Sequence, residues 1–216
     1  MSQMLGIKVI GYDIFNMLTN FCNVLINHKE EFIDELKKFK INRDEFDYNR
    51  NILLNYWEKI KPETLNYKTR NKLELTTQDL TLLDNDNIKQ AVYYYYNMTL
   101  SYGPMFLGWQ SSTEINKERF NRRIDKLKKL NLINLEINCA SFEEILENHI
   151  NDFLFLDPPY YLEGDSKIFK GIYPNCSFPI YHNGFNHIKL AESLTKFINI
   201  TPGLHPLSRK IMTLKI

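Results

Sequence analysis

Apolar residues near the N-terminus follow first a strand-like and then a helix-like pattern. β-branched residues occur between Ile7 and Ile10, shortly before Gly11 and Asp13, which predicts a buried strand that ends at an acid. Over residues 16–40 the apolar positions recur every three or four residues, which predicts a helix with an interruption at residues 27–28. A strand, an acidic turn and a helix together form half of a βαβ unit.

The middle of the chain carries helical patterns separated by polar segments. The apolar spacing predicts helices over residues 44–57, 87–100 and 117–130, whereas residues 66–86 are polar and show no clear period. The four consecutive tyrosines at 93–96 are interpreted as packing residues rather than as a platform for nucleic-acid bases. This part of the chain is therefore predicted to be mainly helical.

Strands and helices alternate again after residue 131. Residues 135–139 and the fully apolar residues 153–156 predict two short strands, the second of which stops at Asp157. Between them a short helix is predicted to start at Ser141, which has the spacing of a capping box with Glu144. A long polar loop over residues 161–185 and a helix over residues 186–197 follow.

This order of elements predicts an α/β fold with a doubly wound parallel sheet that is interrupted by an insertion. We expect residues 1–40 and 131–216 to form the α/β domain and residues 41–130 to form an inserted, mainly helical lobe. Ligands of such sheets lie at the carboxyl ends of the strands. Asp13 and Asp157 are both expected at such ends, which makes them candidates for binding or catalysis.

The composition narrows the class of protein. Apolar residues make up 44% and charged residues 25% of the chain, which excludes a disordered protein. The formal net charge of +1 means that any nucleic-acid surface is a local basic patch. Cys22, Cys139 and Cys176 are scattered and contain no CxxC pair, which argues against a disulfide framework and a zinc knuckle, so no metal site is expected.

The sequence shows no targeting pattern and no membrane-spanning pattern. The N-terminus lacks a basic region followed by an apolar segment, and no apolar run approaches the length needed to cross a bilayer. We therefore expect a soluble, cytoplasmic protein without a membrane partner.

The tetrapeptide Asp157-Pro158-Pro159-Tyr160 carries the most distinctive chemistry. Two successive prolines stiffen the turn and have no N–H, so the turn presents hydrogen-bond acceptors beside an aromatic ring. Such a surface suits an exocyclic amine, which donates two hydrogen bonds, on a flat base that can stack on Tyr160. The alternative is a simple turn that ends the strand, since Asp and Pro are common turn residues.

An Asp-Pro-Pro-Tyr turn after an apolar strand resembles the signature of methyltransferases that act on amino groups of adenine or cytosine in DNA. The flanking residues are similar to the Dam-like (D12) class of adenine-N6 methyltransferases. They include a second aromatic at Tyr161 and a later helix with His187 and the Leu190–Ala191 pair. Segments around Asp13, Asn97 and Phe142 also resemble the class, so the resemblance covers about residues 5–196.

The resemblance implies a Rossmann-like methyltransferase sheet with an inserted target-recognition lobe, and S-adenosylmethionine as the cofactor. By this resemblance Asp13 would bind the ribose hydroxyls of the cofactor, Ser141 and Phe142 would meet its adenine, and Asp157 would border it. For each of the first three a structural role remains open. Asp13 and Ser141 could cap helices, and Phe142 could be a core residue.

The mechanism that the resemblance implies is direct methyl transfer to a flipped adenine in double-stranded DNA. Asp157 and the Pro158 carbonyl would hold the two N6 protons, Pro159 would stiffen the turn, and Tyr160 would stack on the base. The basic helix over residues 117–129 offers candidate contacts to DNA phosphates, namely Arg119, Arg122 and Arg123. The alternative for this helix is a solvated surface without a partner.

The chain also departs from the family pattern. Members of this class open with a strand and a Phe-x-Gly-x-Gly loop that approaches the cofactor, and no such loop is recognisable here. We therefore expect a sheet that is incomplete at both ends, and a second polypeptide as a candidate source of the loop. Two alternative functions follow: a catalytically inactive DNA-binding remnant, or an enzyme acting on an amine in RNA, protein glutamine or cytosine N4.

Overall fold

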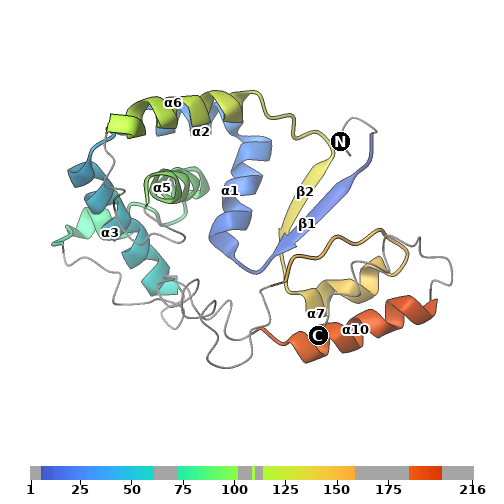
Figure 1. The fold of residues 1–216 in the computed structure, drawn as a ribbon. Helices are drawn as coiled ribbons and strands as arrows, with labels where there is room; N and C mark the ends of the chain where they lie inside the picture. Colours follow the sequence, from blue (N-terminus) through green and yellow to red (C-terminus); the bar gives the residue numbers. More distant parts are fainter. Residues whose placement is uncertain (1–5, 61–72, 102–108, 110–113, 159–184, 201–216) are drawn as a thin grey trace.

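The computed structural model describes residues 6–60, 73–101, 109, 114–158 and 185–200 (Figure 1). They form a mixed α/β structure with a small parallel sheet and many helices. In chain order the elements are β1 (Val9–Asp13), α1 (Asn16–Asn27), α2 (Lys29–Leu36), α3 (Arg43–Ile60), α4 (Thr77–Thr81), α5 (Asn87–Leu100), α6 (Glu114–Lys128), β2 (Leu135–Cys139), α7 (Phe142–Ile145), the 3-10 helix η4 (Leu146–His149) and α10 (His187–Ile200).

β1 and β2 pair in parallel, with Val9 opposite Leu135 and Asp13 opposite Cys139. Both strands were predicted, and β1 ends at Asp13 as expected, but its residues are only half-buried and not buried as predicted. A Cβ at the position of Gly11 would lie 2.7 Å from Ile137 Cδ1 on β2, so glycine leaves room for the end of the Ile137 side chain. The register places Asp13 and the residues after Cys139 at one end of the sheet.

The main core is helical and centres on α5, against which α1, α2, α3 and α6 pack (Figure 1). Tyr93, Tyr94 and Tyr96 are buried, which confirms their interpretation as packing residues. Phe21 on α1 stacks on Tyr95 with ring centroids 5.2 Å apart. The helices of the first forty residues therefore share their core with those of residues 43–128.

The helix boundaries follow local signals. α5 and β2 have the bounds that the apolar pattern predicts, and the interruption at residues 27–28 is confirmed, because α1 ends at Asn27 and α2 begins at Lys29. Asp86 caps α5 by accepting a hydrogen bond from the Lys89 amide at 2.9 Å. The short helix α4 lies in the segment that showed no clear period.

The structure corrects the strand predicted over residues 153–156. These residues pair with no strand among the described residues, and Phe153 and Phe155 are 79% and 80% exposed. An apolar run becomes a strand only when a neighbouring strand satisfies its backbone, and within the described residues the sheet consists of β1 and β2. Leu154 instead packs against a small cluster formed by α7, η4 and α10.

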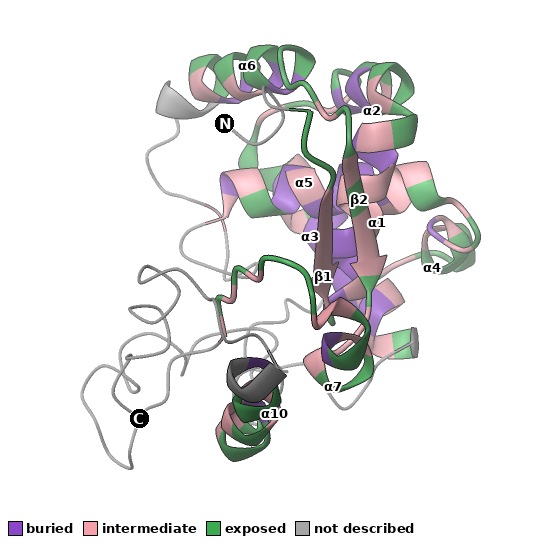
Figure 2. Ribbon diagram, turned by 90° about the vertical axis from the view of Figure 1, so that its right-hand side faces the viewer, coloured by how far each residue is buried: buried purple, intermediate pink, exposed green. Residues whose placement is uncertain are grey.

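The sheet itself is unusually open. Figure 2 shows β1 in the intermediate burial class throughout, and no residue of either strand is buried. Parallel sheets are normally covered on both faces, so the described residues leave part of this sheet without its usual cover. Among the described residues no helix is long and apolar enough to cross a membrane.

Candidate active site

Asp13 closes β1 and lies at the carboxyl end of the sheet, as predicted. Its Oδ1 atom accepts a hydrogen bond from the Phe15 amide at 2.7 Å, and its carbonyl oxygen accepts one from the Ala140 amide at 3.2 Å. Partial burial raises the pKa of the Asp13 carboxyl, and the Phe15 hydrogen bond lowers it by a smaller amount. The carboxylate is therefore held in a fixed direction in a partly desolvated position.

Asp13 also shapes its surroundings at the start of α1. Burial is the main cause that raises the pKa of the Cys22 thiol, and the negative charge of Asp13 adds to it. Asn16, the first residue of α1, has a buried Oδ1 atom without a hydrogen-bond partner. Through its Oδ1 atom, Asp13 thus supports the turn that leads into α1. This contact agrees in part with the alternative that Asp13 caps a helix.

Ser141 and Phe142 follow β2 and reach the same end of the sheet as Asp13. Ser141 and Glu144 form the predicted capping box, in which the Ser141 amide donates to Glu144 Oε2 at 2.8 Å. The Phe142 ring is half-buried, lies 5.2 Å from the ring of Phe185, and packs against the cluster of α7, η4 and α10. Both residues thus have a structural role.

The Asp157–Pro158 part of the signature turn follows the extended segment after η4. Asp157 is exposed and Pro158 is half-buried, so the carboxylate is accessible to a ligand. Pro159 and Tyr160, which were also predicted to be catalytic, lie outside the described residues. The structure therefore brings Asp13, Ser141 and Phe142 to one end of the sheet, and it describes the first two residues of the Asp157–Tyr160 turn.

Comparison with known families places this geometry in context. The model of the D12 class N6 adenine-specific DNA methyltransferases matches residues 3–200 of the chain. The chain belongs to this family. The match spans nearly the whole sequence, and it supports an enzyme that methylates DNA at adenine. Comparison with curated proteins and with solved structures finds no match.

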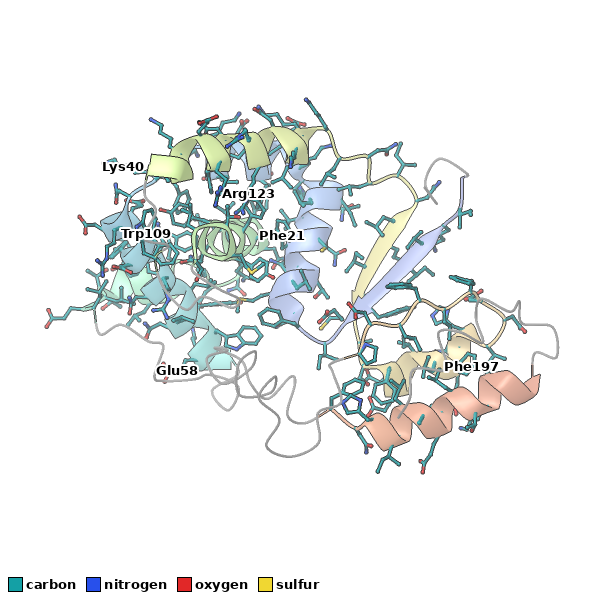
Figure 3. All side chains as sticks on the ribbon, in the orientation of Figure 1. Phe21, Lys40, Glu58, Trp109, Arg123 and Phe197 are labelled. Carbon is teal, nitrogen blue, oxygen red and sulfur yellow. The ribbon has the colours of Figure 1, made fainter. Side chains whose placement is uncertain are left out.

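Within this methyltransferase the basic helix α6 places its three candidate arginines differently. Arg122 is exposed and lies 3.8 Å from Glu118, whereas Arg119 is half-buried. Arg123 points from α6 toward α5 (Figure 3), and its Nη1 atom donates to the Thr99 carbonyl oxygen at 2.7 Å. Arg123 therefore already has a structural partner, and Arg122 is the most accessible of the three.

The sequence interpretation missed one polar cluster close to this site. The Tyr12 hydroxyl lies 2.8 Å from His149 Nε2, and His149 Nδ1 lies 2.7 Å from Asp152 Oδ2. The only signal in the sequence is the three-residue spacing of His149 and Asp152, which is common on helices. Within the described residues, no group of three or more His, Cys, Asp or Glu side chains could hold a metal ion.

Proposed function

We propose that this chain is an S-adenosylmethionine-dependent enzyme that methylates N6 of an adenine flipped out of double-stranded DNA. The observation that carries the proposal is the family match over residues 3–200, which includes both Asp13 and the Asp157–Tyr160 turn. An adenine within a stacked duplex cannot present its amine to a second substrate, so the base leaves the helix.

The residues at the end of the sheet fit the cofactor chemically. S-adenosylmethionine supplies the activated methyl group when bound, and its ribose hydroxyls are hydrogen-bond donors that suit the fixed, partly desolvated carboxylate of Asp13. Ser141 contributes a hydroxyl and Phe142 a half-buried ring for the adenine. Asp157 borders the same ligand from the other half of the site.

The signature turn positions the acceptor base. The Asp157 carboxylate and the Pro158 carbonyl oxygen accept the two hydrogen bonds of the adenine amine, which fixes the direction of its nitrogen. Pro159 stiffens the turn, and Tyr160 stacks on the base. Rate enhancement then comes from orientation and electrostatics, without a covalent enzyme intermediate.

The helical part of the chain serves target recognition in this proposal. Residues 41–130 form the recognition lobe, and the residues 1–40 and 131–216 form the halves of a Rossmann-like doubly wound sheet. Arg122 and Arg119 on α6 face DNA phosphates. Arg123 holds α6 against α5 through its bond to Thr99. The lobe is built on α1 and α2, whose core it shares.

The open sheet supports one more element of the proposal. The strand residues lack full burial, and Phe153 and Phe155 expose large apolar rings. We propose that a strand followed by a Phe-x-Gly-x-Gly loop adds to β1 and covers these rings, and that a second polypeptide supplies it. Such a strand would satisfy the backbone of β1 and bury the apolar segment next to it.

The decisive experiment titrates S-adenosylmethionine into the purified chain by calorimetry and then measures incorporation of labelled methyl into unmethylated DNA. We expect binding and incorporation at adenine N6. Asp157→Ala abolishes incorporation but leaves the contacts of Asp13 to the cofactor, so binding is retained, whereas Asp34→Ala, which removes an exposed carboxylate on α2, changes neither. DNA binding without cofactor binding, even with a candidate partner strand added, identifies an inactive DNA-binding remnant and refutes the proposal.

A further inference from the structure

Tyr12 and His149 connect two parts of the molecule that are 137 residues apart in sequence. Tyr12 is the penultimate residue of β1, and His149 is the last residue of η4. Besides the 2.8 Å contact between the Tyr12 hydroxyl and His149 Nε2, the two rings pack with centroids 5.3 Å apart. The contact therefore combines a hydrogen bond with ring packing, and the His149 side chain is only 15% exposed.

The third member of the cluster determines the direction of the hydrogen bonds. Asp152 Oδ2 lies 2.7 Å from His149 Nδ1, and an ionised carboxylate can only accept, so Nδ1 carries a proton. In neutral His149 the Nε2 atom is then an acceptor, and the Tyr12 hydroxyl donates to it. When His149 is protonated, Nε2–H donates to the Tyr12 oxygen instead. Both bonds persist in both states.

The cluster links the two halves of the proposed site. Neighbouring residues of a strand point to opposite faces, so Asp13 extends toward the start of α1 while Tyr12 extends toward η4. On the other side the Asp152 amide donates to the His149 carbonyl oxygen at 3.0 Å, and five residues later the chain reaches Asp157. A short path thus connects Asp13, through Tyr12, His149 and Asp152, with the turn that begins at Asp157.

The segment between these points has little other support. Residues 153–158 have no helix or strand hydrogen-bond pattern, and Phe153 and Phe155 are exposed. Leu154 anchors the segment to the cluster of α7, η4 and α10, which belongs to a different core from that of α1 and α5. The bond from the Ala140 amide to the Asp13 carbonyl oxygen holds the chain where β2 leads into α7, and the contact between Tyr12 and His149 adds a second link that lies closer to Asp157 in sequence.

We propose that Tyr12, His149 and Asp152 are positioning residues that hold the segment carrying Asp157 and Pro158 in register with Asp13. The inference rests on the proposed function for its effect on turnover, and it stands on the geometry of the cluster for its effect on the segment. The three side chains act through the backbone of residues 150–158 and need not touch either ligand.

The first test compares Tyr12→Phe, which removes one hydroxyl and keeps the ring, with Tyr48→Phe. Tyr48 also donates its hydroxyl to a carboxylate, Asp79 at 2.5 Å, but lies on α3 away from the site. We expect Tyr12→Phe to lower kcat about tenfold while the KM for S-adenosylmethionine stays unchanged, since misplacement of reacting groups affects turnover. Tyr48→Phe leaves both constants unchanged. An equal loss of thermal stability and activity in both variants overturns the proposal.

The second test separates the cluster from the proposed activity. Hydrogen–deuterium exchange of the full chain should show faster exchange of the amides of residues 146–152, which include η4 and the hydrogen-bonded Asp152 amide, in Tyr12→Phe than in Tyr48→Phe. His149→Gln, which retains hydrogen-bonding groups, should exchange more slowly than His149→Ala. If the parent chain shows no methyl transfer, the proposed function fails, but this exchange difference still decides the link. Unchanged exchange in Tyr12→Phe and His149→Ala refutes it.

Nuclear magnetic resonance gives an independent signature. Nitrogen-15 chemical shifts should place the proton of neutral His149 on Nδ1, because Asp152 accepts from that atom. Tyr12→Phe should keep this tautomer, whereas Asp152→Ala should release it. A proton on Nε2 in the parent chain contradicts the arrangement of the cluster.

Discussion

Arg123 on α6 donates a hydrogen bond to the carbonyl oxygen of Thr99, in the last turn of α5, over 2.7 Å. The last four carbonyl groups of a helix have no partner within that helix. A cation near this end is also attracted by the partial negative charge of the helix dipole. The bond therefore links α6 to the central helix of the core. It gives a structural role to Arg123, one of the three arginines that the sequence offers as candidate DNA contacts.

Arg123→Ala is expected to destabilise the fold. The change removes a charged hydrogen bond and leaves the Thr99 carbonyl without its partner, at a cost of about 1–3 kcal/mol in the free energy of unfolding. Urea unfolding followed by circular dichroism measures it. Arg122→Ala, on the exposed side of the same helix, should change stability by less than about 0.5 kcal/mol. Equal effects of the two variants would show that the Thr99 bond contributes nothing.

DNA binding should show the opposite order. Arg122→Ala removes an accessible charge and is expected to weaken binding to all duplex sequences and to reduce the salt slope of log K by about 1, as for one phosphate contact. Fluorescence anisotropy over a range of salt concentrations measures this slope. Glu118→Gln, which frees Arg122 from its 3.8 Å ion pair, should strengthen binding slightly. An unchanged slope in Arg122→Ala removes α6 from the interface.

Apolar spacing and capping residues predicted those helices and strands whose formation depends on residues close together in sequence. α5 could be placed from the apolar spacing and the Asp86 cap, and β2 from apolar residues that alternate with Glu136 and Asn138. α4 was missed, although Thr76 and Asp79 form a capping box that the sequence displays. Apolar spacing alone gave no signal there because none of the residues of α4 is buried.

Contacts between distant residues were beyond sequence reasoning. The segment 153–156 has a strand composition, but a strand also needs a partner, and that depends on residues elsewhere in the chain or assembly. Asp13 was placed at the sheet end because the ends of strands are visible in the sequence. His149 was overlooked because its partner Tyr12 is 137 residues away.

Asp13→Asn should stabilise the fold and weaken the cofactor site. Folding raises the pKa of Asp13, so the folded state binds its proton more tightly than the unfolded state, and stability falls as pH rises from the unfolded to the folded pKa. Asparagine keeps an acceptor for the Phe15 amide and carries no charge, so Asp13→Asn should unfold at a higher temperature at pH 7 and match the parent chain near pH 3.

The functional half of this prediction concerns affinity. Loss of the charged acceptor should raise the Kd for S-adenosylmethionine by about tenfold or more, since a hydrogen bond to a charged group contributes about 1.5–3 kcal/mol. Calorimetry measures this Kd, and differential scanning at both pH values measures stability. A variant that binds the cofactor as tightly as the parent chain would assign Asp13 to the turn into α1 alone.

Alkaline pH should unfold this protein through its buried tyrosines. Burial raises the pKa of Tyr93, Tyr94 and Tyr96 in the folded state, so the unfolded state loses these protons first and stability falls once pH exceeds about 10. Each such group contributes up to about 1.4 kcal/mol per pH unit to the slope. Urea unfolding between pH 9 and 11 measures the decline.

Tyr96→Phe tests this account one group at a time. The Tyr96 hydroxyl donates to the Lys40 carbonyl oxygen at 2.7 Å, so the variant loses about 0.5–1.5 kcal/mol at pH 8. Its stability should nevertheless fall less steeply above pH 10 than that of the parent chain. Parallel declines in the two proteins would mean that Tyr96 ionises as easily in the folded state as in the unfolded one.

Phe155 offers a test of the open sheet. Its ring is 80% exposed, so Phe155→Ser should change the stability of the isolated chain by no more than about 0.5 kcal/mol. If a strand from another polypeptide covers this ring, the same change should weaken the complex by about 1 kcal/mol or more, because the burial of a phenylalanine side chain is lost.

Co-purification and calorimetry with a candidate strand-and-loop polypeptide measure this difference. The control is Ile133→Ser, a change of an exposed apolar residue before β2. Equal affinities of the parent chain and Phe155→Ser would show that the Phe155 ring stays exposed in the complex. The added strand would then not cover this ring.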